Sequence, residues 1–332
     1  LQKVAGSRLR SILSAMTANS FTRILTGTLI TAIIQSSSAT TVMIVSFVNA
    51  GLLSLTQAVG VIMGANIGTT VTSWLISLLG FTADISTLSI PLIGIGFAFM
   101  MFKSQKRKNI GEMIIGFAML FLGLSFLKDS VPDLSSNPEA IAFIQKWTDW
   151  GFFSVLIFVL VGTVMTIVLQ SSSATVALTL VMASQGWIPF EMAAAMVLGE
   201  NIGTTITANI AASVGNISAK RAALAHTVFN VFGVIWVLAL YKPFLWLVSK
   251  IVVGLGGEDP FVSSASLLYA MSTVHTLFNV LNTCILVWFT PQIVRFVTWA
   301  LKGHKDEEEV FRLRSPRARS PARGFSCSVS LQ

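Results

Sequence analysis

The chain has 332 residues, of which 54% are hydrophobic and only 11% are charged, whereas soluble domains carry about 25% charged residues. This composition excludes an ordinary soluble protein and predicts an all-α integral membrane protein. The net charge is +8, but the basic residues lie in short loops and at the two ends, so we predict membrane topology and no nucleic acid partner. Cys284 and Cys327 provide neither a disulfide framework nor a thiolate metal site.

The N-terminal segment, residues 1–25, is predicted to form an amphipathic helix. The chain begins at Leu1, without an initiator Met and without a signal-peptide pattern. We therefore expect that an upstream helix is missing from this sequence.

Two polar motifs are duplicated at a constant offset of 135 residues. Gln-Ser-Ser-Ser-Ala-Thr at 35–40 recurs at 170–175, and Gly-Ala-Asn-Ile-Gly-Thr-Thr at 64–70 recurs at 199–205 with Glu in place of Ala. The flanks of the two copies agree only in being apolar. Because identity follows the polar residues, which packing alone leaves free to vary, the duplication indicates one binding site built from broken membrane helices of both copies.

Each copy is predicted to contain four short helices. The first ends near Gln35 or Gln170, the second ends before a turn at Gly51 or Gly186, the third ends near Gly64 or Gly199, and the fourth begins at Thr69 or Thr204. Segments of this length cannot all cross a bilayer, so several are predicted to be re-entrant helical hairpins or half-helices inside the protein.

Longer apolar runs follow the motifs, and they are expected to be complete spans at 84–102, 109–127, 222–240 and 267–289. The predicted layout is repeat 1 with its following spans at 26–128, an extracellular connector and lead-in helix at 129–160, repeat 2 with its following spans at 161–303, and a disordered tail at 304–332. The basic loop at 103–108 is assigned to the cytoplasm and the acidic segment at 129–149 to the outside. These assignments make the two repeats inverted in topology and put both termini in the cytoplasm.

The chemistry of the motifs favours an anion with accompanying cations. A serine triplet at the start of a helix offers hydroxyl groups, unpaired backbone N–H groups and the positive end of the helix dipole. The helix that ends just before it leaves free carbonyl groups, which suit sodium. In the second motif we expect the glycines to permit unusual backbone angles and Asn and Thr to supply neutral oxygens.

Together the two motif pairs resemble the type II sodium-dependent phosphate cotransporter family, and most closely its bacterial branch, over residues 1–303. The resemblance implies import of inorganic phosphate across the cell inner membrane by alternating access, with sodium as coupling ion and no other cofactor. It implies phosphate contacts at Gln35, Ser36, Ser37, Ser38, Gln170, Ser171, Ser172 and Ser173. It implies that sodium is bound, or the site formed, by Gly64, Asn66, Thr69, Thr70, Gly199, Glu200, Asn201, Thr204 and Thr205. Many bacterial relatives also carry a cytosolic regulatory domain, which is absent from this chain.

Three further polar residues stand out. Glu200 departs from the repeat, because Ala65 stands at the matching position, and it is interpreted equally as a functional carboxylate or as a structural partner of Lys220, Arg221 or His226. His226 and His275 each begin the pattern His-Thr-X-Phe-Asn. Hydrogen bonding between helices is the favoured interpretation, and a role with protons or ions is the alternative.

No ATP-binding loop, catalytic triad or metal-ligand cluster is recognisable, so an enzyme is not predicted. Two alternatives stay open for the function. One is a transporter of another oxyanion or of a dicarboxylate, and the other is a phosphate-sensing membrane protein that does not move its ligand. A homodimer is an arrangement that the sequence leaves open.

Overall fold

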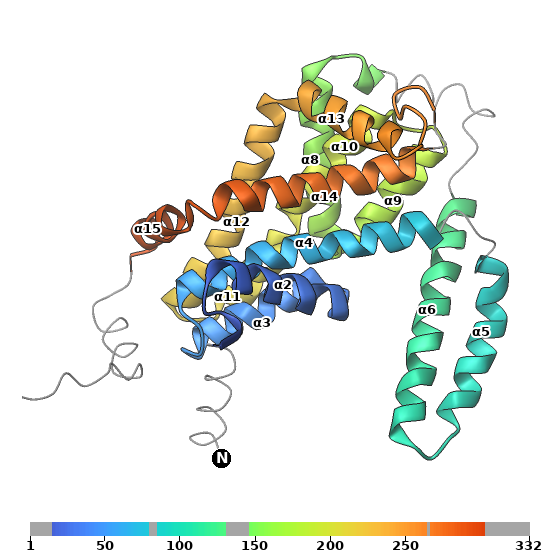
Figure 1. Cartoon of the computed structure of the whole chain (residues 1–332), viewed down its shortest axis with the longest axis horizontal. Coiled ribbons are helices and arrows are strands. Elements are labelled where there is room, and N and C mark those ends of the chain that lie inside the picture. Colours follow the sequence, from blue (N-terminus) through green and yellow to red (C-terminus); the bar gives the residue numbers. More distant parts are fainter. Residues whose placement is uncertain (1–14, 80–84, 131–145, 264–265, 303–332) are drawn as a thin grey trace, which may run out of the picture.

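The computed structural model describes residues 15–79, 85–130, 146–263 and 266–302, and the regular elements in these ranges are α-helices (Figure 1). Residues 1–14 of the expected N-terminal helix, residues 131–145 of the connector and the tail from residue 303 lie outside the described residues. The helices are α2 (Ser20–Ile34), α3 (Ser37–Asn49), α4 (Leu55–Leu79), α5 (Ile85–Met100), α6 (Gln105–Ser130), α8 (Phe152–Leu169), α9 (Ser172–Ser184), α10 (Phe190–Gly203), α11 (Thr205–Ser213), α12 (Ile217–Ala239), α13 (Tyr241–Gly254), α14 (Leu267–Leu286) and α15 (Thr290–Ala300).

Helices α4, α6, α8 and α12 are long and apolar enough to cross a membrane, and α14 with α15 would form a fifth span bent by 84°. The prediction of an all-helical, multi-pass membrane protein is thereby confirmed. Helices α3 and α9 have only 13 residues each, about 20 Å at 1.5 Å per residue, which is less than a hydrocarbon core of about 30 Å. Their re-entrant character and the inverted relation of the repeats stay predictions.

The first break and the glycine turn of each repeat lie where the sequence predicts them. Gln35 and Gln170 are the C-caps of α2 and α8, and a new helix begins two residues after each. The turns after α3 and α9 contain Gly51 and Gly186 at φ values of 70° and 74°. Glycine adopts this left-handed conformation without steric cost.

The second predicted break is wrong in repeat 1. Helix α4 continues without interruption from Leu55 to Leu79, so Gly64 ends no helix and Thr69 begins none. In repeat 2 a boundary exists, but α10 ends at Gly203 rather than near Gly199. Even there the N–H of Thr204 still donates to the carbonyl of Glu200 at 2.9 Å, so the helical hydrogen bonding runs into the boundary.

The motif glycines serve close packing between helices and not a helix end at Gly64 or Gly199. A Cβ on Gly64 would lie 1.9 Å from the carbonyl oxygen of Ile24 in α2, and one on Gly27 would lie 1.9 Å from that of Val61. The same contacts recur 135 residues later between α8 and α10, where a Cβ on Gly199 would lie 2.0 Å from the oxygen of Val159. Two crossings therefore bring helix backbones into direct contact, as small residues do in membrane proteins.

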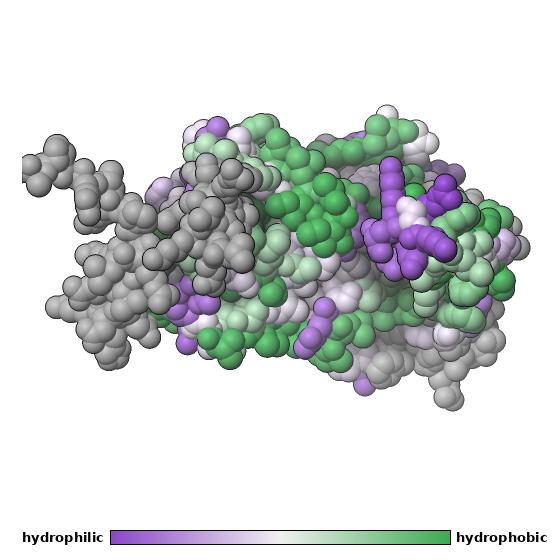
Figure 2. All heavy atoms as spheres, turned by 90° about the horizontal axis from the view of Figure 1, so that it is seen from below, coloured by the Kyte–Doolittle hydropathy of each residue, from purple (hydrophilic) through white to green (hydrophobic). Residues whose placement is uncertain are grey.

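Helices α5 and α6 form a pair that stands at the right of Figure 1, beside the main body. In α6 only 22% of an 18-residue apolar stretch is buried, whereas 78% of the corresponding stretch in α4 is buried. Hydrophilic side chains gather at the right of Figure 2, at the tip of this pair, where exposed Lys103, Lys106, Arg107 and Lys108 lie in or next to the connecting loop. The pair is thus apolar along its length and basic at its tip.

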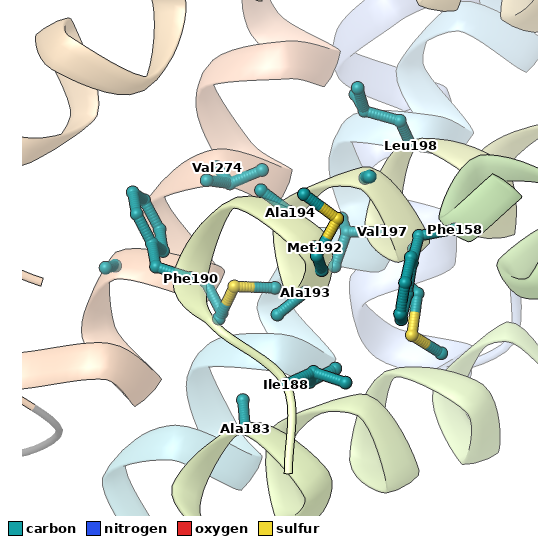
Figure 3. Close-up of a cluster of buried hydrophobic side chains, with 14 of the residues drawn as sticks. Phe158, Ala183, Ile188, Phe190, Met192, Ala193, Ala194, Val197, Leu198 and Val274 are labelled. Atoms are coloured by element: carbon teal, nitrogen blue, oxygen red, sulfur yellow. The ribbon is translucent and has the colours of Figure 1, made fainter. Parts of the chain in front are cut away.

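Helix α10 lies at the centre of the largest apolar cluster. Figure 3 shows its side chains between Phe190 and Leu198 together with Phe158 of α8 and Val274 of α14. Helices α4 and α14 run side by side across the centre of Figure 1. The two repeats also meet at their ends, because Asn216, the N-cap of α12, donates through N and Nδ2 to Oδ1 and O of Asn49 at 2.8 and 2.9 Å.

Candidate substrate and ion site

The two helix breaks share an unusual backbone. Gln35 has φ 57° and Gln170 has φ 52°, and they are the only non-glycine residues with positive φ in the described part of the chain. Each backbone N–H still donates to the carbonyl four residues earlier, Thr31 at 2.7 Å and Thr166 at 2.8 Å. A side chain in the left-handed region costs roughly 1–2 kcal/mol, and such strain concentrates at functional positions.

The first serine of each triplet caps the following helix. Ser36 Oγ accepts from the N–H of Ala39 at 3.2 Å, and Ser171 Oγ accepts from that of Ala174 at 3.3 Å. Each cap leaves its hydroxyl hydrogen available to a further acceptor, because a serine hydroxyl both donates and accepts.

The second and third serines leave donors available. Ser37 and Ser172 are buried, with 5% and 7% of their surfaces exposed, and neither hydroxyl has a hydrogen-bond partner among the residues that the structure describes. Ser38 and Ser173, which are half-buried, lie in the same first turns. The backbone N–H groups of these four serines precede the first helical acceptor, so they too are available. Each break thus presents hydroxyl and amide donors together.

The two glutamines differ in their side chains. Gln35 Nε2 donates to the carbonyl of Ala32 at 2.5 Å, and its Oε1 accepts from Thr72 of α4 at 2.9 Å. Gln170 is exposed and its side chain makes no hydrogen bond within the described ranges. The Gln35 side chain therefore ties the helix break of repeat 1 to α4, whereas the Gln170 side chain makes no such hydrogen bond in repeat 2.

The Asn and Thr residues of the second motif are buried and donate to carbonyl groups three or four residues earlier in the chain. Asn66 and Asn201 donate through Nδ2 to the carbonyls of Ile62 and Val197 at 3.1 and 2.7 Å. The hydroxyls do the same: Thr69 to Ala65, Thr70 to Ile67, Thr204 to Glu200 and Thr205 to Ile202. With the Thr hydroxyl hydrogens and one amide hydrogen of each Asn occupied, these side chains offer oxygen lone pairs, which suit a hard cation.

The predicted role of the motif glycines is wrong. Gly64 and Gly199 lie inside helices and take no positive φ. They allow close contact with α2 and α8 instead, and the freed space admits a hydrogen bond between helices in each repeat. Thr28 Oγ1 donates to the carbonyl of Gly64 at 3.1 Å, and Thr163 Oγ1 to that of Gly199 at 3.0 Å.

The two histidines have different surroundings. His275 Nδ1 lies 2.7 Å from Ser73 Oγ of α4, which matches the favoured interpretation of hydrogen bonding between helices. His226 is fully buried, and neither of its ring nitrogens has a partner. The side-chain oxygens of Asn230 on the same helix and of Asn279 on α14 are also buried without a donor.

Glu200 lies inside the protein and its partner is a residue that sequence reasoning missed. Thr179 Oγ1 of α9 donates to Glu200 Oε1 at 2.7 Å, while Oε2 has no partner. No ion pair joins Glu200 to Lys220, Arg221 or His226 in the described structure. A signal for Thr179 was present, because Ile44 and Ala65 stand together at the two matching positions of repeat 1.

Two strained helix breaks with unpaired donors, in a bundle of long apolar helices, are typical of a multi-pass membrane protein of the transporter type. The particular family follows from comparison, since a sequence profile of the Na+/Pi-cotransporter family matches residues 1–129 and 139–257. The chain belongs to this family. The resemblance recognised from the motifs is confirmed.

Several curated proteins are similar to the chain. It is 29% identical over 298 residues to the inorganic phosphate export protein YjbB of Salmonella typhimurium, covering 89% of this chain and 51% of that protein. It is 31% identical over 302 residues to the uncharacterised protein YqeW of Bacillus subtilis, covering 90% of each chain. Sodium-dependent phosphate transport protein 2A of Oryctolagus cuniculus is 43% identical over 77 residues, which are 23% of this chain and 12% of that protein. The chain spans about half the length of YjbB, and no solved structure matches it.

Proposed function

We propose that this protein is a sodium-coupled secondary transporter of inorganic phosphate. The observation that carries the proposal is the pair of matching helix breaks, at which both left-handed glutamines precede a serine-capped helix start. A phosphate ion carries about 1.5 to 2 negative charges near neutral pH and presents several acceptor oxygens. The complementary donors are the hydroxyls of the capping serines, Ser36 and Ser171, those of the unpartnered serines, Ser37 and Ser172, and the free backbone N–H groups of the two helix starts.

The same elements explain how phosphate would be held without a fixed cation. A buried basic side chain would bind phosphate strongly but would also remain charged when the site empties, which is costly in an apolar surrounding. Neutral hydroxyls and helix dipoles avoid this cost. The charge of phosphate is then balanced by sodium ions at the carbonyl oxygens that end α2 and α8 and at the Asn66 and Asn201 oxygens.

The direction of transport follows from the gradients rather than from the site. A coupled carrier moves phosphate with sodium down their combined gradient, so an inward sodium gradient drives import, as we propose for this protein. The name of YjbB states export. The proposal therefore predicts that reversing the sodium gradient across the same membrane reverses the movement of phosphate.

The test uses purified protein in liposomes, with radiolabelled phosphate and an inward gradient of sodium, potassium or choline. Sodium alone should drive accumulation. Ser37→Ala and Ser172→Ala should each weaken phosphate binding at least about tenfold, because a hydrogen bond to a charged ligand contributes about 1.5–3 kcal/mol. Ser46→Ala and Ser184→Ala are matched controls on the same two helices, since these hydroxyls donate to Val42 and Val181 of their own helices.

The outcomes separate the alternatives. Accumulation of sulfate or a dicarboxylate in place of phosphate would identify another anion as the substrate. Phosphate binding without accumulation under any gradient would identify a sensor. Unchanged phosphate affinity in both triplet variants would overturn the shared site of the two repeats.

A further inference from the structure

The Glu200 carboxyl group is a buried acidic group whose charge, when it is ionised, the described part of the protein does not balance. Only 1% of Glu200 and none of Thr179 is exposed. One oxygen accepts from the Thr179 hydroxyl at 2.7 Å and the other has no partner. A single neutral hydroxyl does not compensate an ionised carboxylate in an apolar interior. An ionised Glu200 therefore needs a bound cation, since the described polypeptide supplies no counter-charge there, and without a cation the carboxyl group holds a proton.

The fold itself does not need this polar pair. Repeat 1 has the same order of helices, with α3 and α4 in the places of α9 and α10, and its matching residues are Ile44 and Ala65, only 2% and 0% exposed. Both members of the pair thus change together between the repeats, from apolar to polar. A structural role would leave this joint change unexplained, because the apolar pair is equally well buried.

The neighbouring helices supply no competing charge close to α10. Helices α8, α9 and α11, which contact α10, contain no ionisable side chain. The ionisable residues of α12 and α14, which also contact it, are Lys220, Arg221, His226, Tyr269, His275 and Cys284. None of them forms an ion pair with Glu200 in the described structure.

Further oxygen lies on the next helix. Asn279 of α14 donates to Asn201, the residue after Glu200, at 3.3 Å, and its own side-chain oxygen is buried without a donor. Carboxylate, hydroxyl and amide oxygens are ligands for a hard cation. The described residues contain no cluster of three His, Cys, Asp or Glu side chains, so the site is unsuited to a transition metal, and one carboxylate balances one positive charge.

We propose that Glu200, oriented by Thr179, holds a sodium ion that repeat 2 has and repeat 1 lacks, and that the Asn279 oxygen is one of its further ligands. The site deepens the proposed function and rests on it only in taking sodium as the ion. Its consequence is that the two halves of the duplication bind different numbers of ions. Glu200 holds the ion by charge, and Thr179 orients the carboxylate by donating to its other oxygen.

The test is equilibrium binding of radioactive sodium to purified protein without phosphate. The informative variant is Thr179→Ile with Glu200→Ala, which installs the buried pair that repeat 1 already contains. It should bind one sodium ion fewer per chain than the wild type. Glu200→Gln keeps the shape but removes the charge, and it should weaken that one ion at least about tenfold. Glu191→Gln, on the same helix but only partly buried, is the control that should bind as the wild type does.

Folding is checked by thermal unfolding and gel filtration of each variant. Equal sodium counts and affinities in folded wild type and folded double variant would overturn the proposal, as would unchanged binding in a folded Glu200→Gln protein. The latter result would show that a proton neutralises the carboxylate. Since no phosphate is present in the binding experiment, its result is independent of the result of the liposome experiment. Failure of sodium-driven phosphate transport would therefore count against the proposed function and not against this site.

Discussion

Replacing the glycines at the two backbone crossings is the sharpest test of the architecture. In Gly64→Ala the new Cβ would lie 1.9 Å from the carbonyl oxygen of Ile24. Carbon and oxygen atoms in contact between helices keep about 3.3 Å apart, so α2 and α4 must separate by about 1.4 Å. The obstacle is backbone, which cannot turn aside as a side chain could.

The cost can be estimated from opposing terms. Forcing a methyl group into a packed interior costs about 3 kcal/mol at the upper end of the usual range. Alanine recovers up to about 1 kcal/mol through its better helix propensity. The net loss of about 2 kcal/mol corresponds to a fall of about 5 °C in the unfolding temperature. The hydrogen bond from Thr28 to the Gly64 carbonyl, 3.1 Å long, would lengthen as well.

The assay is thermal unfolding of purified variants followed by tryptophan fluorescence. Gly199→Ala should cost as much as Gly64→Ala, because its Cβ would lie 2.0 Å from the Val159 oxygen. The matched controls are Gly94→Ala and Gly116→Ala, where an added Cβ meets nothing within 4 Å. If both crossing variants melt with the controls, the helices do not pack backbone to backbone and the reasoning fails.

Other substitutions test single contacts. Ser73→Ala should lower stability by about 1–3 kcal/mol in the same unfolding assay, because it leaves the buried Nδ1 of His275 without its partner, whereas the exposed Ser46→Ala should change little. Gln170→Gly should raise stability by about 1 kcal/mol, because glycine adopts the left-handed backbone without strain. The same variant should lose phosphate uptake in liposomes. A stable variant with full uptake would show that Gln170 is not part of the site. Asn216→Ala should lower the unfolding temperature more than Asn19→Ala. Each variant loses a helix cap of about 1 kcal/mol, but Asn216→Ala also loses the hydrogen bond from the Asn216 amide to the Asn49 carbonyl. Equal melting temperatures of the two variants would contradict the contribution of that hydrogen bond.

Part of this structure could be predicted from the chain alone. The breaks at Gln35 and Gln170 were predictable because a polar triplet inside an apolar run must end one helix and cap another. The course of α4 through Gly64 was not, because a glycine that ends a helix and a glycine that admits a neighbouring backbone are the same residue in a sequence. Only the presence of Ile24 opposite it decides between them.

The polar contacts between distant helices were equally hidden. Ser73 and His275 are 202 positions apart, and nothing local to either indicates the other. Thr179 is the opposite case. Comparing the repeats at buried as well as polar positions would have shown that Glu200 and Thr179 replace Ala65 and Ile44 together. The phosphate contacts predicted for the two serine triplets stay predictions until phosphate binding there is measured.

The glycine crossings have a mechanical consequence. Where two helices meet through side chains, they can slide or tilt by changing rotamers, but a contact between backbones has no rotamers to change. Helices α2 and α4 should therefore move as one body, as should α8 and α10, and large internal motion is directed to the short helices α3 and α9 that follow the breaks. Each repeat thus consists of a rigid pair of helices and a short helix that is joined to it at the glutamine.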